Sequence, residues 1–226
     1  AYAPASVTDR APYYSINFPF DTGPGPYKLW KNETGSAYAF TRGGVDVNRD
    51  GLTLIPLVGS MSNVPATSAY IDQLKGQGIA KSLTAEQMAA QLNAQGIDLQ
   101  AISEQLLPQL SPALRKTAQT LLGQAVPLKY FVSVKTRLLV EPTTGAIVSL
   151  DSIDQTLTAS PDVKEFAQLG QALAASPVAG RPAVKQAIDT LTALTNTPAV
   201  KVLEMNYRQT PSSVSEFASY AKGKAD

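Results

Sequence analysis

The sequence predicts an α+β fold: a curved antiparallel β-sheet with helices packed on it and a helical insertion between strands. An aromatic block rich in turn residues opens the chain, and Ala/Gln/Leu-rich stretches with helical spacing follow it. Strand-like runs then return without strict strand–helix alternation, which favours an antiparallel sheet. We expect one domain over 1–226, with strands in 1–59, a helical insertion in 60–125, a β-hairpin in 126–159, helices in 160–196, and a strand and C-terminal helix in 197–226.

The first 59 residues have the pattern of short strands joined by tight turns. Ile16, Phe18 and Phe20 alternate with Asn17 and Pro19, which is the period of a strand with one buried face. The pair Tyr38 and Phe40 repeats this period further along, and Gly23-Pro-Gly-Pro26 and Gly43-Gly44 supply turns between the runs.

The insertion 60–125 has the pattern of amphipathic helices. Apolar residues at 85, 88, 89 and 92 follow helical spacing, and Thr84 with Gln87 forms a capping-box pattern before them. Leu99, Ile102 and Leu106 predict a second helix. Ser111-Pro112 predicts the start of a third, as a cap followed by a first-turn proline.

A long hairpin is predicted in the middle of the chain. Residues 128–140 are β-branched and aromatic, and residues 146–150 lead into a second strand. Glu141–Gly145 lies between these runs. Pro142 suits an early turn position, and we expect Gly145 to adopt positive φ.

Two helices, a strand and a last helix complete the predicted order. Ser160-Pro161-Asp162 is expected to open the first helix, and Pro182 the second. Alternation over 199–208 predicts a strand, and Ser213 with Glu216 is expected to cap the final helix.

Composition excludes much familiar chemistry. The chain has no histidine and no cysteine, which removes the Ser-His-Asp triad, thiol nucleophiles, disulfides and the usual zinc ligands. Its net charge of +1 gives no field to hold a polyanion, so we expect no nucleic-acid partner. We expect no cofactor and no catalytic residues.

Asp46-Val-Asn-Arg-Asp-Gly51 resembles the first half of an EF-hand loop. Its twelfth position, which should be a bidentate Glu, is Leu57, and an apolar strand follows instead of a helix. We therefore interpret this segment as a turn between strands and expect no metal site.

Carboxylate pairs could still support glycoside chemistry without histidine. Five acids lie at predicted turns or strand ends, and their spacing singles out no pair: Asp21, Glu33, Glu141, Asp151 and Asp154. Solvated turn acids are the simpler interpretation.

Aromatic residues are concentrated at the start of the chain, where five of nine Tyr, three of six Phe and the single Trp lie within residues 1–40. Two interpretations stay open. The block is either a sheet core with exposed turn tyrosines, or an apolar groove whose Tyr and Trp side chains hold a lipid or glycolipid.

Several short motifs in the same order resemble the actinobacterial PorA-like envelope proteins of uncharacterised function. Together they span roughly residues 15–222: Phe18-Pro-Phe-Asp21, Tyr27-Lys-Leu-Trp30, Val47–Leu52, Tyr130-Phe131, Val140–Val148, Asn206-Tyr207 and Ser212-Ser-Val214 with Ala218 and Ala221.

This resemblance implies a setting outside the cytoplasmic membrane. Members of the family are typically membrane-anchored, with their soluble region on the periplasmic side. A mycobacterial member is a partner of the exporter of trehalose monomycolate. The chain begins with alanine and shows no anchor, so we expect a trimmed extracytoplasmic domain of an anchored protein.

The function expected from these observations is glycolipid binding without catalysis. The ligand would be trehalose monomycolate or a related glycolipid, and the partner an inner-membrane mycolate exporter, in cell-envelope assembly and polar growth. A scaffold for polar elongation machinery that binds no lipid is an alternative, as is a carboxylate-based glycoside-processing enzyme. The expected ligand-binding residues are Phe18, Phe20, Tyr27, Trp30, Tyr38, Phe40, Tyr130 and Tyr207.

Overall fold

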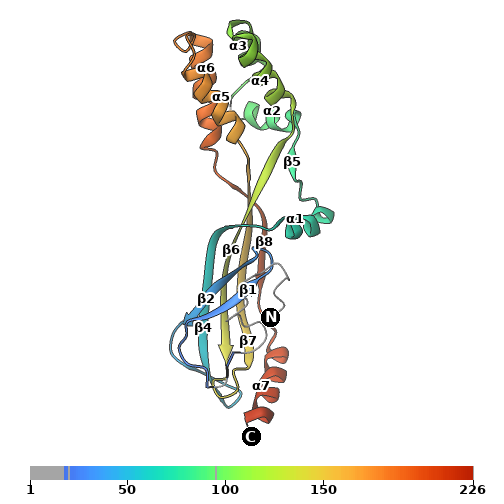
Figure 1. The fold of residues 1–226 in the computed structure, drawn as a ribbon. Coiled ribbons are helices and arrows are strands. Elements are labelled where there is room, and N and C mark those ends of the chain that lie inside the picture. Colours follow the sequence, from blue (N-terminus) through green and yellow to red (C-terminus); the bar gives the residue numbers. More distant parts are fainter. Residues whose placement is uncertain (1–17, 20, 95, 226) are drawn as a thin grey trace. The chain divides into compact units, whose positions relative to one another are not determined.

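A computed structural model describes residues 18–19, 21–94 and 96–225. The predicted α+β class is confirmed: over these residues an open antiparallel sheet of eight strands has helices inserted between its strands. The order along the sheet is β1-β2-β4-β6-β7-β8, while β3 pairs with β4 and β5 with β6 (Figure 1).

The chain divides into two compact units, which are described separately. The strand unit contains the described residues up to 74, residues 130–158 and those from 201 onward. The helical unit contains residues 75–129 and 159–200. Residues 75–125 of the expected insertion and the helices expected at 160–196 thus gather in one unit from two distant parts of the sequence.

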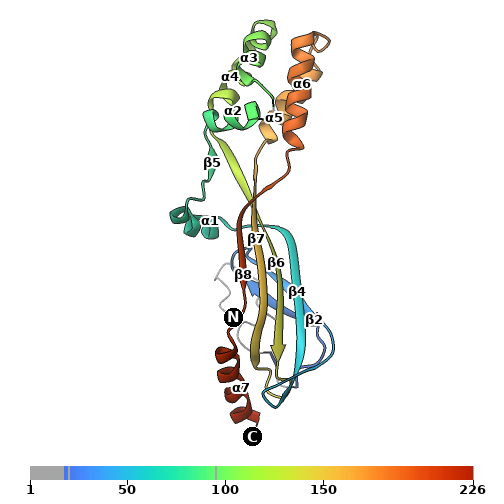
Figure 2. The ribbon, with the colours of Figure 1, turned by 180° about the vertical axis from the view of Figure 1, so that it is seen from behind.

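The strand unit holds most of the sheet and its last helix. Its elements are β1 (Tyr27–Lys31), β2 (Ser36–Arg42), β3 (Val47–Arg49), β4 (Leu52–Pro65), α1 (Ser68–Leu74), most of β6 (Val126–Val140) and β7 (Ile147–Pro161), β8 (Val200–Tyr207) and α7 (Pro211–Ala225). Figure 2 shows the long strands β4, β6 and β7 from behind.

The central strands of this unit are buried on both faces. Ile55 and Leu57 of β4 pack with Phe18 and Phe40 on one face. Leu54 packs with Leu139 and Val148 on the other face, where α7 contributes Val214, Ala218 and Ala221 at helical spacing. Burial on both faces explains why this part of β4 reads as a continuous apolar run.

The predicted hairpin at 141–145 is confirmed. β6 and β7 flank a turn in which Gly145 has φ 69°, as the sequence predicted. The N–H of Phe18 donates to the Gly145 carbonyl oxygen at 2.7 Å, and that of Thr22 donates to Pro142 at 2.7 Å. The segment around Phe18 and the turn, which are separate motifs in the sequence, therefore lie side by side.

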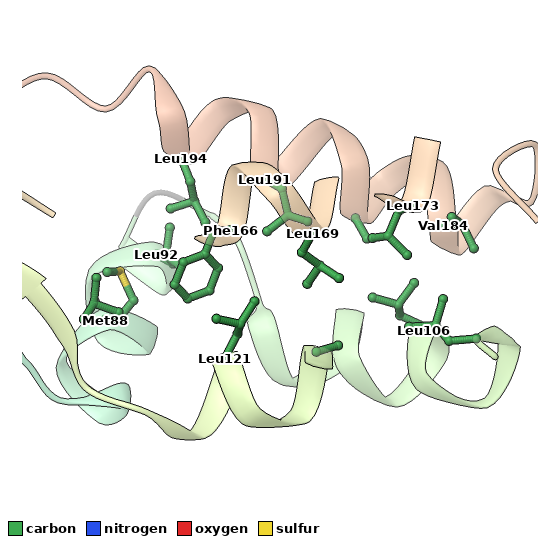
Figure 3. Packing of buried hydrophobic residues seen from close by; sticks show 14 residues of the cluster. Met88, Leu92, Leu106, Leu121, Phe166, Leu169, Leu173, Val184, Leu191 and Leu194 are labelled. Atoms are coloured by element: carbon green, nitrogen blue, oxygen red, sulfur yellow. The ribbon is translucent and has the colours of Figure 1, made fainter. Parts of the chain in front are cut away.

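The helical unit contains two groups of helices around one apolar core. The first group comprises a 3-10 turn (Lys75–Gln77), β5 (Ser82–Leu83), α2 (Ala85–Ala94), α3 (Leu99–Leu106), a second 3-10 turn (Leu107–Gln109) and α4 (Pro112–Gly123). The second comprises α5 (Lys164–Ala174) and α6 (Pro182–Thr195). In Figure 3, Phe166 and Leu169 of α5 point toward Leu121 of α4.

Two predicted helix starts in this unit are confirmed by their caps. The Thr84 N–H donates to Gln87 Oε1 at 2.9 Å, and the Gln87 N–H donates back to Thr84 Oγ1 at 3.1 Å, which is the reciprocal capping box. Ser111 accepts from the Leu114 N–H at 3.4 Å, and Pro112 occupies the first turn of α4.

Three predicted boundaries were wrong. β4 continues to Pro65, past the expected end at 59, because it pairs with β6 as far as Phe131. Pro161 ends β7, and α5 begins only at Lys164, whose N–H donates to Asp162 Oδ1 at 3.4 Å. α7 begins at Pro211, where the hydroxyl of Thr210, in place of Ser213, accepts a backbone N–H.

Over the described residues, every helix is too short or too polar to cross a bilayer.

Candidate functional site

The predicted aromatic residues of the N-terminal block divide into buried and partly exposed members. Phe18 and Phe40 are buried, the latter with 0% exposed surface, and they pack with Leu57, Leu138 and Val140. The rings of Phe18 and Tyr27 meet edge to face with centroids 5.0 Å apart. This arrangement is that of a close-packed aromatic core.

The tyrosines of the block are tied to neighbouring groups. Tyr27 Oη accepts the Gly23 N–H at 2.8 Å, and Tyr38 Oη lies 3.1 Å from Thr136 Oγ1. Burial raises the pKa of Tyr38, the Thr136 hydrogen bond lowers it, and the charge of Glu33 raises it; the net shift is upward.

The remaining predicted residues are spread over the strand unit. Trp30 is half-buried on β1, opposite Ala37 of β2. Tyr130 is buried on β6, and this burial raises the pKa of its phenol. Tyr207 is 49% exposed at the end of β8. Phe20 lies outside the described residues. A ligand role for these eight side chains stays a prediction.

A cleft of about 470 Å³ with charged and apolar lining lies elsewhere in the strand unit. We call it the Arg49–Arg208 cleft. Four segments line it, namely the β3–β4 turn, β7, the link between β8 and α7, and the first turns of α7: Arg49, Asp50, Ser149, Asp151, Arg208, Gln209, Pro211, Val214 and Ser215.

Local structure explains why these segments meet. Asp50 and Gly51 have φ values of 51° and 74°, the signature of a tight hairpin turn, which sets Arg49 at the end of β3. Gln209 Oε1 accepts the Leu150 N–H at 2.6 Å and so ties the link after β8 to β7. The apolar face of α7 then fixes its first turns beside the cleft.

Each arginine of the cleft has a carboxylate partner. Arg49 Nη1 donates to Ser149 Oγ at 3.4 Å and lies 4.0 Å from Asp151 Oδ1. Arg208 Nη2 donates to Asp154 Oδ1 at 3.0 Å. Asp151 also meets Arg137 of β6, whose Nε lies 3.5 Å from Asp151 Oδ2. Exposed ion pairs such as these contribute only about 0–1 kcal/mol to stability, so their main effect here is to orient donors and acceptors.

The lining can recognise a ligand rich in hydroxyl groups. Guanidinium groups and serine hydroxyls donate, while carboxylates and the Gln209 amide accept. Val214 and Pro211 add apolar surface to this lining. A volume of about 470 Å³ lies within the range of ordinary small-molecule sites. Over the described residues the structure contains no cluster of acids that could hold a metal ion.

The sequence does not reveal this cleft. Asp151 stands out in it only as one of five turn acids, and Arg49 only as part of the EF-hand-like segment and of the family-like motif Val47–Leu52. Arg49 and Ser149 lie 100 residues apart, and Arg208 and Asp154 lie 54 apart. No local pattern marks such pairs, because only the pairing of the strands and the docking of α7 bring them together.

The helical unit contains smaller spaces. Inside its core the clefts beside Phe166 measure about 20 and 30 Å³, which is room for about one water molecule. A shallower groove of about 230 Å³ between α5 and α6 is lined by small and apolar side chains, including Gly170 and Leu191.

The fold and the cleft thus define an α+β protein with a charge-paired cleft on an open antiparallel sheet. No protein-family model matches the chain, and no curated protein matches it at a significant level.

Proposed function

We propose that the chain is a non-enzymatic, extracytoplasmic glycolipid-binding protein that works with an exporter of trehalose monomycolate, and that the Arg49–Arg208 cleft holds the sugar head group. The observation that carries this proposal is the cleft itself, with its volume of about 470 Å³ and its mixed donors and acceptors. The setting and the partner follow from the resemblance to the PorA-like envelope proteins.

A sugar suits the cleft because hydroxyl groups both donate and accept hydrogen bonds. The arginines can donate to sugar oxygens, and the carboxylates of Asp50 and Asp151 can accept from sugar hydroxyls. The small apolar surface of Val214 can meet the C–H face of a sugar ring.

An acyl chain needs an apolar path away from the head group. Met205 and Tyr207 lie near the end of β8, and the cleft residue Arg208 directly follows Tyr207. Both apolar side chains are 40–50% exposed, at 42% for Met205 and 49% for Tyr207. Large apolar side chains exposed together on an edge strand are typical of a surface that meets a lipid or a partner. They therefore favour a glycolipid over a free sugar.

The test is to compare Arg49→Ala and Arg208→Ala with Arg42→Ala as a matched control. Arg42 also forms an exposed ion pair, with Asp46, but does not line the cleft. Binding of trehalose and of trehalose monomycolate should weaken at least tenfold in the two cleft variants, which corresponds to about 1.4 kcal/mol for each factor of ten. The control should bind as the wild type does, and all three should keep wild-type melting temperatures.

Equal binding by all three variants would place the ligand outside this cleft. An absence of binding by the wild-type protein would favour the scaffold alternative. The enzyme alternative is favoured by one observation, that the carboxylates of Asp50 and Asp151 line the same cleft. Release of glucose from the glycolipid, lost in Asp151→Asn, would replace the binding proposal with glycoside chemistry.

A further inference from the structure

The charges of the Arg49–Arg208 cleft are arranged in pairs. Asp151 lies between two guanidinium groups, 4.0 Å from Arg49 Nη1 and 3.5 Å from Arg137 Nε. The Arg137 Nε atom is buried and has no hydrogen bond within the described part of the chain, so the ion pair with Asp151 compensates its charge. Asp154 compensates Arg208 in the same way.

Without these carboxylates the cleft would be an anion site. Guanidinium groups bind phosphate and carboxylate through parallel, charge-assisted hydrogen bonds, and they are the usual ligands for such groups. The first turn of α7 lines the same cleft and adds the positive end of a helix dipole. Asp151 and Asp50 line the same cleft and carry negative charge. A phosphate that enters the cleft is therefore repelled by these carboxylates as well as attracted by the arginines.

We propose that Asp151 determines the specificity of this cleft: by occupying the guanidinium groups of Arg49 and Arg137, it makes the site select neutral saccharides and reject phosphorylated ones. This inference rests on the proposed function, because it concerns the same cleft and the same sugar head group. It goes further in naming the residue that sets the charge of the accepted ligand.

The experiment compares Asp151→Asn with Asp46→Asn. Both substitutions remove one carboxylate charge beside an arginine of the strand unit, but Asp46 pairs with Arg42 and lies outside the cleft. Titration calorimetry with trehalose, trehalose 6-phosphate and inorganic phosphate gives the affinities. Wild-type protein should bind trehalose 6-phosphate at least tenfold more weakly than trehalose.

In Asp151→Asn this preference should be lost, with a gain of at least tenfold in affinity for trehalose 6-phosphate and a measurable affinity for phosphate. The gain should shrink at high ionic strength, because salt screens exposed charges. Asp46→Asn should keep the wild-type preference. Asp151→Ser, which also removes the carboxylate between Arg49 and Arg137, should show the same gain and carries the test if Asp151→Asn does not fold.

The outcomes separate the two proposals. If the wild type binds trehalose 6-phosphate as tightly as trehalose, or if neither cleft variant gains phosphate affinity, the role of Asp151 is wrong while glycolipid binding stands. If the wild type binds no trehalose but the cleft variants gain phosphate affinity over Asp46→Asn, glycolipid binding is wrong and the control of ligand charge by Asp151 stands.

Discussion

Glu141 shows how one buried carboxylate organises the turn between β6 and β7. The residue is 5% exposed, and its carboxylate accepts the N–H groups of Thr143 at 2.9 Å and Thr144 at 2.7 Å, together with the Thr144 hydroxyl at 2.6 Å. Burial raises the pKa of Glu141, but the hydrogen bonds from Thr144 and Thr143 outweigh it, so the pKa lies below its ordinary value.

This lowered pKa predicts how stability depends on pH. The ionised form is favoured in the folded state, so its contribution is present above the ordinary value of 4.5 and is lost as the pH falls through the lower pKa of the folded protein. Glu141→Gln should reduce the free energy of unfolding at pH 7 by about 1–3 kcal/mol, because buried N–H groups lose their charged acceptor. Urea denaturation between pH 3 and pH 7 measures this difference, which should shrink below pH 4.5.

Glu216→Gln is the control for this experiment, since Glu216 is exposed on α7. It should stay within about 0.5 kcal/mol of the wild type at pH 7. If the free energy of unfolding of Glu141→Gln were lower than that of the wild type by the same amount from pH 7 to pH 3, the loss would come from changed packing, and the charge of the carboxylate would contribute nothing.

A second prediction separates core aromatics from exposed ones. Phe40 is fully buried and its ring covers Gly59, its partner across β2 and β4. Phe40→Ala should lower the free energy of unfolding by about 3–5 kcal/mol. Tyr207→Ala, at an exposed position, should change it by about 0.5 kcal/mol or less. Urea midpoints of both variants give the comparison.

These two variants also test the original aromatic-groove hypothesis. If Phe40→Ala kept its midpoint and lost glycolipid binding, Phe40 would line a ligand groove that opens in solution. If Tyr207→Ala alone lost binding, the ligand surface would lie at β8, next to Arg208.

At the scale of elements, the turn between β3 and β4 explains the EF-hand-like segment. Asp50 and Gly51 form the turn, Asn48 Oδ1 accepts the Thr53 hydroxyl at 3.0 Å, and Asp46 pairs with Arg42. Asn48 thus has its partner within the hairpin and Asp46 has its partner on β2, while the position of the closing Glu is occupied by Leu57.

We therefore expect millimolar calcium to leave the melting temperature unchanged, as measured by differential scanning fluorimetry with and without a chelator. Magnesium serves as the control for ionic effects. A saturable increase with calcium that Asp46→Ala removes would identify a real site in this turn.

The sequence predicted elements best where local chemistry decides them. The capping box at Thr84 and Gln87 and the positive φ of Gly145 depend on neighbours within three or four residues, and both are confirmed. At Gly145 a side chain would also overlap the Phe18 carbonyl oxygen, a long-range reason that no local pattern contains. The end of β4 was missed, because its length is set by pairing with β6 and not by its own residues.

At the scale of the whole molecule, the sequence predicted the order of the elements but not their grouping. Residues 75–129 and 159–200 form one helical unit although a hairpin of the strand unit separates them along the chain. The cleft could not be predicted from the sequence for the same reason. Its arginines and carboxylates come from β3, the β3–β4 turn, β7 and the link before α7, and the spacing of residues does not reveal how distant segments pair.

The two units also differ in the chemistry of their cores. Among the described residues, the buried polar side chains all belong to the strand unit: Thr22, Thr136, Glu141, Ser149 and Gln155. The helical core is made of apolar side chains such as Leu173 and Phe166. Each unit thus has a core that is complete within its own residues, and this predicts that one unit can lose stability while the other keeps its structure and its function.

Leu173→Ala tests this independence. Leu173 is fully buried among α3, α5 and α6, so the truncation should lower the stability of the helical unit by about 2–5 kcal/mol. Hydrogen exchange should show lost protection in α3–α6, while amides of β4 and of β6 beyond residue 130 keep theirs. Because the Arg49–Arg208 cleft is built only from the strand unit, saccharide affinity should remain within twofold of the wild type.

Leu57→Ala in the core of the strand unit is the matched control and should produce the reverse pattern, with protection lost in the sheet and saccharide binding weakened. If Leu173→Ala instead reduced protection in both units equally and weakened saccharide binding, the chain would unfold as one cooperative body and the helical core would support the cleft directly.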